Sequence, residues 1–403
     1  MNPGSEGPAV ATGILVFFVL ILAELAVSTR MQRPVYRLRN AVSNLATGAV
    51  HGLANAYYAA SLGGYYEAFR LRFGVHDFSR MSWWSYAALV VLVDFLFYWN
   101  HRLLHKNRFM WCAHVVHHQS TDYNYTVSLR VSILQVWYAA IFGLPLALAG
   151  FPIAAVWPVF IADKFYQFWI HTRLIGPLGP LEWVLVTPQH HSVHHATNPE
   201  YVDKNFGGMF IVWDRIFGTF AARKAEPIFG IDGLLTTFDP VLANVDQWQR
   251  IWRTFRGKPA LTDLPPADAQ PFLGTDTSAE GGRSPAEVGL VESALRLFAP
   301  VTVLLTFLYT QGPFSMEWVV AIAVAFLWLR RLGQFLDRKF LGRTLDVGVI
   351  AAGAITAGVA LFAGWIHAPL ALAITAGCVM LTAETLVEPA AALRARALEA
   401  LRS

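Results

Sequence analysis

The chain has 403 residues, of which 55% are hydrophobic and only 14% are charged, and its net charge is +4. This composition excludes an ordinary soluble domain and indicates a protein of the lipid bilayer. Two cysteines, Cys112 and Cys378, cannot form a disulfide framework, and the Lys and Arg residues lie between apolar segments instead of in one patch, which argues against nucleic acid as a partner.

Apolar runs that approach the ~20 residues needed for a membrane-spanning helix recur along the chain. In order, they lie near residues 12–29, 42–62, 83–100, 131–150, 151–171, 295–311, 316–332, 347–366 and 368–387. The first run follows a weakly acidic start, so we interpret it as a span and not as a signal peptide. The fourth and fifth runs meet at Gly150 and Pro152, so this pair could instead form a shallow hairpin. We therefore predict an all-α, polytopic integral-membrane bundle.

The composition changes at residues 257–291, which are rich in Pro, Gly, Asp and Ser. Such a composition is typical of a flexible linker. It divides the chain into a membrane domain at 1–256, with a core at about 40–255, and a hydrophobic region at 292–403 with four predicted helices. Truncation near Thr262 is therefore expected to leave metal binding intact, because every clustered histidine precedes residue 200.

The distribution of basic residues predicts the orientation in the membrane. Basic clusters follow the first, seventh and ninth runs, at 30–39, 330–343 and 394–402. Alternating spans place these clusters on one side, which the positive-inside rule assigns to the cytoplasm. The same alternation places segments 101–118 and 187–220 on that side, whereas it leaves Arg70, Arg72 and Arg80 outside. We therefore expect the histidine-rich segments to face the cytoplasm.

Three short motifs hold nine of the 13 histidines. They are HRLLH (His101, His105), HVVHH (His114, His117, His118) and HHSVHH (His190, His191, His194, His195). Residues three and four apart share a helix face, so each motif presents several imidazoles in one direction. Imidazole is a ligand for iron, zinc and copper, and one tetrahedral zinc ion needs only about four ligands. The nine histidines therefore indicate two metal ions.

Other metal sites are excluded by residues that the sequence lacks. Two distant cysteines cannot hold an iron–sulfur cluster, and no Glu-x-x-His motif of a soluble carboxylate-bridged di-iron bundle occurs. The lone His51, His76 and His367 are interpreted as interfacial or core residues. His171 ends an apolar run on the same side as the motifs, and it is either a further ligand or a wall of the site.

Asp94 lies seven residues before His101, which is two helical turns back on the same face. An ionisable side chain inside an apolar run is costly and indicates a function. We expect its carboxylate to accept the second N–H group of a ligand imidazole and so to fix the tautomer of that ring. The alternative is an acid exposed to a polar cavity. Glu24 and Glu384 also lie in apolar runs, but no motif connects them to the metal ions.

The order of the motifs, HxxxH, HxxHH and HxxHH, resembles that of the fatty acid hydroxylase/sterol desaturase superfamily of membrane di-iron oxygenases. Within it, the chain is most similar to the alkylglycerol monooxygenase branch. The similarity covers about residues 40–255 and rests on HHQSTDYN (117–124), FYQFWIHT (165–172), GPLGPLEWVLVTPQHHSVHH (176–195), YVDKNFGGMFIVWDRIFGTF (201–220) and FGIDGLLTTFDP (229–240). Two positions depart from the usual pattern: Lys106 replaces a common acid, and Ser192 replaces the Arg of HRVHH.

The resemblance implies two iron ions, O2 as the oxidant, and insertion of one oxygen atom into a C–H bond of a membrane lipid. In the ether-lipid branch, the attacked carbon lies next to the ether oxygen, the hemiacetal collapses to an aldehyde and a glycerol, and tetrahydrobiopterin is the reductant. The chain carries no Rossmann or haem motif, so its electrons must come from a small reductant such as a reduced pterin or from an electron-donor protein such as a ferredoxin or cytochrome.

Two alternative functions are also compatible with the sequence. The same motifs fit a sterol or fatty-acid desaturase or hydroxylase of the superfamily. A histidine-rich membrane metal transporter or sensor belongs to a different class, but it would place ionisable ligands near the middle of the membrane. The motifs instead lie at the ends of predicted spans and in the segments that connect them.

Overall fold

The computed structural model describes residues 6–231, 237–257 and 316–337. The first helices are α1 (Glu6–Arg30), α2 (Leu38–Phe73), α3 (Trp83–Lys106), α4 (Arg108–His118) and α5 (Tyr125–Ser128). They are followed by α6 (Gln135–Ala149), α7 (Ile153–Trp169), the 3-10 helix η2 (Gly179–Trp183), α8 (Pro188–His194), α9 (Val212–Ile216), α10 (Pro240–Phe255) and α12 (Met316–Leu336). Within these ranges the protein is helical, with only isolated β-bridges in place of strands.

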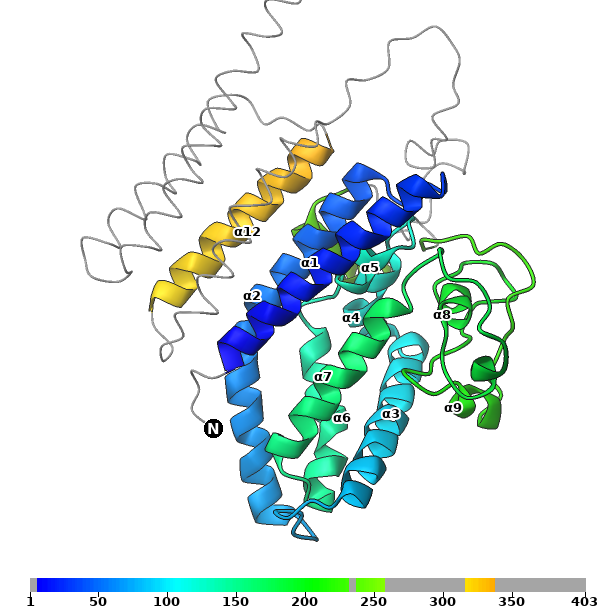
Figure 1. The fold of residues 1–403 in the computed structure, drawn as a ribbon. Coiled ribbons are helices and arrows are strands. Elements are labelled where there is room, and N and C mark those ends of the chain that lie inside the picture. The colour runs from blue at the N-terminus through cyan, green and yellow to red at the C-terminus, as the bar shows by residue number, and fades with distance from the viewer. Residues whose placement is uncertain (1–5, 232–236, 258–315, 338–403) are drawn as a thin grey trace, which may run out of the picture.

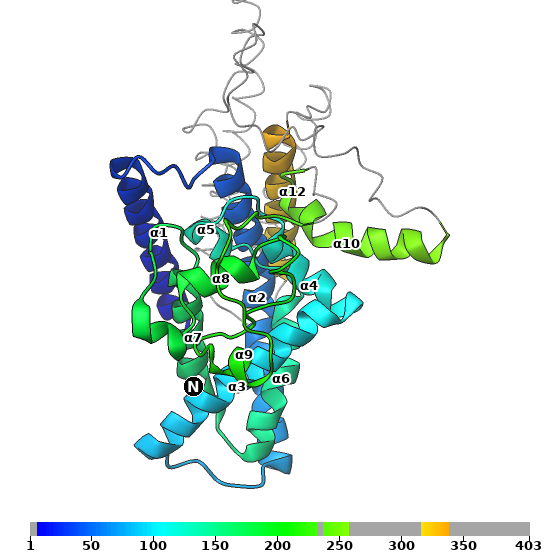
Figure 2. The ribbon, with the colours of Figure 1, turned by 90° about the vertical axis from the view of Figure 1, so that its right-hand side faces the viewer.

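Long helices form a bundle, and a lobe of loops and short helices lies against one side of it (Figures 1 and 2). The lobe contains α8 and α9 and lies beside α3. One apolar core joins α2, α3, α6 and α7, where Tyr66, Leu89 and Leu146 are buried together. The hydroxyl of Tyr66 donates to the carbonyl oxygen of Phe151 at 2.9 Å, so the one polar group of that side chain is satisfied.

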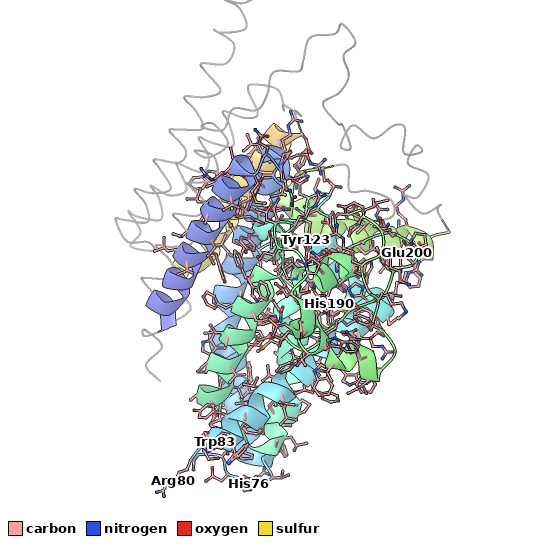
Figure 3. The ribbon with its side chains drawn as sticks, turned by 45° about the vertical axis from the view of Figure 1, so that its right-hand side comes forward. His76, Arg80, Trp83, Tyr123, His190 and Glu200 are labelled. Carbon is pink, nitrogen blue, oxygen red and sulfur yellow. The ribbon has the colours of Figure 1, made fainter. Side chains whose placement is uncertain are left out.

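The turn between α6 and α7 requires glycine. Gly150 has a φ of 106°, and a side chain there would collide with the carbonyl oxygen of His76. Figure 3 shows His76, Arg80 and Trp83 at the end of the bundle opposite to Tyr123 and His190. His76 therefore lies far from the segments that carry the histidine motifs, as expected for a histidine outside the metal site.

Asn107 ends α3 and begins α4. Its side chain accepts hydrogen bonds from the backbone N–H groups of Phe109 and Met110, at 3.0 and 3.1 Å, which is the usual role of an N-cap residue. The chain turns sharply at this residue. The turn brings the end of α3 against α4, and with it His101 against His114.

Within the described residues, α3 alone is long and apolar enough to cross a membrane by length and composition. The sequence predicted more spans, but α6 and α7 have only 15 and 17 residues, and the predicted run in α2 is interrupted by Asn44, His51 and Asn55. The predicted runs at 295–311, 347–366 and 368–387 lie outside the described residues. The multi-pass topology and the cytoplasmic orientation therefore stay predictions.

The predicted linker lies almost wholly outside the described residues, and α12 is the described part of the region that follows it. Asp337, at the end of α12, accepts a hydrogen bond from the backbone N–H of Phe238 at 2.6 Å and another from the hydroxyl of Thr237. Gly333 lies directly against Asp239. These contacts join α12 to the segment that begins α10.

Candidate metal centre

Nine histidines converge in two adjacent groups, whose ligand nitrogens lie within 4.8 Å of one another in each group. We call the first group site A and the second group site B. Site A contains His101, His105, His114, His118 and His194, and site B contains His117, His171, His191 and His195. The two groups touch, because the rings of His118 and His195 stack with their centroids 4.3 Å apart.

Three helices and their ends supply eight of the nine histidines, and His171, which follows α7, supplies the ninth to site B. His101 and His105, one turn apart on α3, both belong to site A. Helix α4 gives His114 and His118 to site A but His117 to site B, and α8 with its C-cap gives His194 to site A but His191 and His195 to site B. The i, i+3 and i+4 spacings therefore build both groups at once, with α4 and α8 shared between them.

Backbone carbonyl groups fix the tautomers of four histidines, two in each site. A carbonyl oxygen can only accept, so the Nδ1 atom facing it carries the proton and Nε2 presents a lone pair. The N···O distances run from 2.7 to 3.0 Å, and the pairs are His101 with Phe206, His194 with Lys204, His117 with Arg130, and His171 with Gln167.

The Nε2 atoms then face one another. In site B, Nε2 of His171 lies 3.1 Å from Nε2 of His117 and 3.0 Å from Nε2 of His191. The first contact joins two lone pairs, which repel each other unless a cation lies between them. Adjacent ligands at right angles, with metal–nitrogen bonds of ~2.1 Å, lie ~3 Å apart, so this spacing fits a shared metal ion.

Site A shows the same need for a cation. The Nε2 atoms of His101 and His114 lie 2.9 Å apart. The Nε2 atoms of His105 and His194 are buried and find no hydrogen-bond partner among the described residues. Unpaired buried nitrogens are costly unless a ligand satisfies them, so the donor set of each site fits a bound metal ion.

Burial also keeps these rings in the form that binds metal. Loss of solvation lowers the pKa of His117 to about 3 and that of His194 to about 4, in spite of the hydrogen bonds to backbone carbonyls. Burial, with the neighbouring imidazoles as a further cause, also lowers the pKa of His118, His191 and His195 well below the usual value. The rings are therefore neutral at pH 7, as metal ligation requires.

The comparisons with known proteins identify this region. Residues 86–219, which include both sites, match the family described as fatty acid hydroxylase. The resemblance inferred from the three histidine motifs is thereby confirmed.

Several relatives share a longer part of the chain. Alkylglycerol monooxygenase of Homo sapiens is 39% identical over 251 residues, which are 61% of this chain and 55% of the relative. The enzyme of the same name from Danio rerio is 35% identical over 287 residues, 65% of this chain and 63% of the relative. Methylsterol monooxygenase 1 of Rattus norvegicus is 28% identical over 156 residues, 36% of this chain and 50% of the relative. The chain thus spans little more than half the length of its curated relatives, and no solved structure matches it.

His190 lies in the fatty acid hydroxylase domain but outside both groups. Its Nδ1 atom accepts the backbone N–H of Thr187 at 3.4 Å, so the ring contributes to the capping box that begins α8. Its ring meets the edge of Phe220, with centroids 5.6 Å apart. The structure therefore leaves His190 out of the ligand sets, whereas it brings His171 into site B.

The carboxylate of Asp94, on α3, is hydrogen-bonded to the lobe that contains α8 and α9. It accepts hydrogen bonds from the backbone N–H groups of Met209 and Phe210, at 2.5 and 3.2 Å, and from Nε1 of Trp213 at 2.8 Å. The expected acceptor role toward an imidazole is instead taken by backbone carbonyls, as in the contact of His101 with Phe206. Asp94 therefore holds the segment that leads from Phe206 into α9.

Sequence reasoning missed two polar side chains of this lobe, Asn205 and Asp214. Both are fully buried, and both hold the backbone around Phe206, whose carbonyl oxygen meets His101. Asp214 lies in the motif WDRIFGTF, which alone indicated only an amphipathic interfacial helix. The available signal in the sequence was an acid placed among the large apolar residues of that motif.

The two departures from the usual family pattern leave the ligand sets intact. Lys106 forms an ion pair with Asp203 at 2.6 Å, and the carboxylate of Asp203 lies 3.7 Å from Nδ1 of His105. Ser192 donates a hydrogen bond to the carbonyl oxygen of Gln189 at 2.8 Å, within its own helix. Neither side chain displaces a histidine from its site.

Glu24 joins α1 to site B, a connection that no sequence motif indicates. Its carboxylate accepts hydrogen bonds from the hydroxyl groups of Tyr36 and Thr172, and from the backbone N–H of Tyr125 at 2.8 Å. Thr172 follows His171 directly in the chain. The acid in the first apolar run therefore secures the segment that carries one of the site B ligands.

Proposed function

We propose that the protein is a membrane-bound, non-haem di-iron monooxygenase that hydroxylates a C–H bond of a lipid with O2. The observation that carries the proposal is the pair of adjacent all-histidine groups with lone pairs facing inward. Two ions of iron, when bound, supply the redox chemistry that activates O2, which zinc cannot supply. Membership of residues 86–219 in the fatty acid hydroxylase family supports a lipid as the substrate.

The residues of the chain hold and shield this centre. The nine imidazoles of sites A and B bind the ions, and four backbone carbonyls keep the protons on Nδ1, away from the ligand atoms. Tyr123 covers site B. Its ring centroid lies 5.3 Å from that of His195, and the ring stacks on Phe229 with the two centroids 4.9 Å apart. Its hydroxyl donates to the carbonyl oxygen of Ile170 at 2.9 Å, so the ring is fixed and excludes water from that side.

An alkylglycerol ether lipid is the substrate that the relatives favour, since the alkylglycerol monooxygenases of Homo sapiens and Danio rerio share 39% and 35% identity with this chain. Hydroxylation of the carbon next to the ether oxygen gives a hemiacetal, which collapses to an aldehyde and a glycerol. Incorporation of one oxygen atom, with reduction of the other to water, consumes two electrons and two protons. A reduced pterin such as tetrahydrobiopterin or an electron-donor protein must supply these electrons.

The site is proposed to face the cytoplasm, where such reductants are found. The basic clusters in the sequence and the position of His105 at the last turn of α3 support this placement. The positions of the site A ligands disfavour a metal transporter, which would hold its ligands near the middle of the membrane. These ligands lie instead at the end of the candidate span and on the helices that follow it. A sterol or fatty-acid hydroxylase or desaturase remains the alternative within the family.

Turnover under ¹⁸O2 distinguishes cleavage of an alkylglycerol ether from oxidation of a sterol or fatty acid. Purified protein in lipid nanodiscs is supplied with an alkylglycerol and reduced pterin, and any aldehyde is trapped by reduction to its alcohol. We expect the alcohol to carry one ¹⁸O atom and free glycerol to accumulate, while a His114→Ala variant is inactive and a His76→Ala control is active. A desaturated or hydroxylated product from sterols or fatty acids would select the alternative, and the absence of oxygen-dependent turnover with every lipid class would contradict the proposal.

A further inference from the structure

One short segment supplies carbonyl acceptors to two of the five site A histidines and places a carboxylate near a third. We call residues 203–206 the ligand strap. Within it, the carbonyl oxygen of Lys204 accepts from His194 at 2.9 Å, and that of Phe206 accepts from His101 at 2.9 Å. At its start, the carboxylate of Asp203 lies 3.7 Å from Nδ1 of His105.

Site B does not use the ligand strap. His117 and His171 donate instead to the carbonyl oxygens of Arg130 and Gln167, which belong to other parts of the bundle. The two sites therefore differ in what orients their ligands. The orientation of site A depends on one stretch of four residues, whereas that of site B depends on separate segments.

The backbone of the ligand strap has an uncommon conformation. Asp203 and Asn205 have φ values of 59° and 56°, in the left-handed region that residues other than glycine rarely adopt. Asp and Asn tolerate this region better than other side chains. The two left-handed residues alternate with Lys204 and Phe206, and this alternation lets both of the latter direct their carbonyl oxygens at histidines of one site.

Two buried side chains hold the ligand strap in this conformation. The amide of Asn205 donates to the carbonyl oxygens of Ala221 and His190, at 2.8 and 3.0 Å, and accepts the N–H of Ala221 at 2.8 Å. The carboxylate of Asp214 accepts the backbone N–H of Phe206 at 2.8 Å and that of the next residue at 2.7 Å. Both side chains act on the strap without contributing a nitrogen or oxygen atom to either metal group.

We propose that the ligand strap is a positioning device for site A alone, and that Asn205 and Asp214 are its positioning residues. The inference rests on the proposed two-metal function. Without the strap, His101 and His194 lose the carbonyls that keep the proton on Nδ1, so their Nε2 lone pairs are no longer aimed at site A. Loss of such outer contacts typically weakens metal binding by about 10–100-fold. Site B keeps its own carbonyls and its affinity.

The test measures the two metal ions separately. The full chain, loaded with ⁵⁷Fe, is titrated with a chelator while retained iron is counted and Mössbauer spectra are recorded. The variants are Asn205→Ala, Asn205→Gly and Asp214→Asn. The matched control is Asn198→Ala, because Asn198 bridges Glu226 and Ile228 of the same lobe without contacting the ligand strap.

We expect Asn205→Ala to release one of two irons at a chelator concentration about 10–100-fold lower than the wild type, while the second iron is unaffected. Asn205→Gly, which still permits the left-handed backbone, should shift less, and Asn198→Ala should match the wild type. If Asn205→Ala does not fold, Asn205→Gly and Asp214→Asn are judged by the same measurement. Joint release of both irons, or no shift in any folded variant, would overturn the inference. A wild type that holds no iron pair would instead refute the proposed function.

Discussion

Replacing Asp94 by Asn removes one acceptor from a buried carboxylate that accepts three N–H groups. If the remaining oxygen keeps Phe210 and Trp213, the new amide group faces the N–H of Met209, which then has no acceptor. A hydrogen bond to a charged group contributes about 1.5–3 kcal/mol, and an unsatisfied buried donor costs about 1–3 kcal/mol. These two costs largely overlap because they describe the same lost interaction, so we expect a local loss of about 2–4 kcal/mol.

Hydrogen exchange measures this loss directly, because local opening controls the protection of the segment. Peptides covering 207–213 should exchange about 30- to 700-fold faster in Asp94→Asn, since each 1.4 kcal/mol is a factor of ten. An Asp77→Asn control, at an exposed aspartate whose partner is Ser79, should leave these peptides unchanged. Unchanged protection at 207–213 together with loss of iron would refute this reasoning and restore the direct role of Asp94 toward an imidazole.

Two further substitutions distinguish a metal ligand from a histidine that caps a helix. His171→Ala should lower the iron content toward one ion per chain, whereas His190→Ala should keep both ions and lower only the thermal stability. Metal analysis of the folded variants measures both effects, and equal iron loss in the two variants would contradict the assignment. Gly208→Ala places a methyl group 2.8 Å from both Asp94 and the ring of Phe97, so we expect destabilisation by about 1–3 kcal/mol. The melting temperature should fall, and an unchanged melting temperature would contradict this packing.

Spacing in the sequence carried most of the information about the histidines. The i, i+3 and i+4 pattern predicted that each motif faces one way, and it led to the inference of two metal ions. It could not predict which site each ring joins, because α4 and α8 each serve both. His190 shares the i+4 spacing with His194, but it lies in the first turn of α8, where its ring caps the helix.

Other features depend on tertiary contacts that no motif marks. His171 joins site B because the end of α7 lies against His117 and His191, which are distant in sequence. Every residue has a carbonyl group, so the acceptors at Lys204 and Phe206 have no sequence signal. The helical class follows from the long apolar runs, but the runs do not give the helix ends, since α6 and α7 begin later and end earlier than the runs do.

Metal content is the most direct test of the central claim that sites A and B together hold two iron ions. The full chain is purified from cells grown with iron and analysed for all transition metals per chain, alongside His114→Ala and the distant His76→Ala. We expect about two irons per chain in the wild type and in His76→Ala, fewer in His114→Ala, and oxygen-dependent lipid turnover only where both irons are present. One ion or none in an active wild type, or zinc in place of iron, would contradict the account.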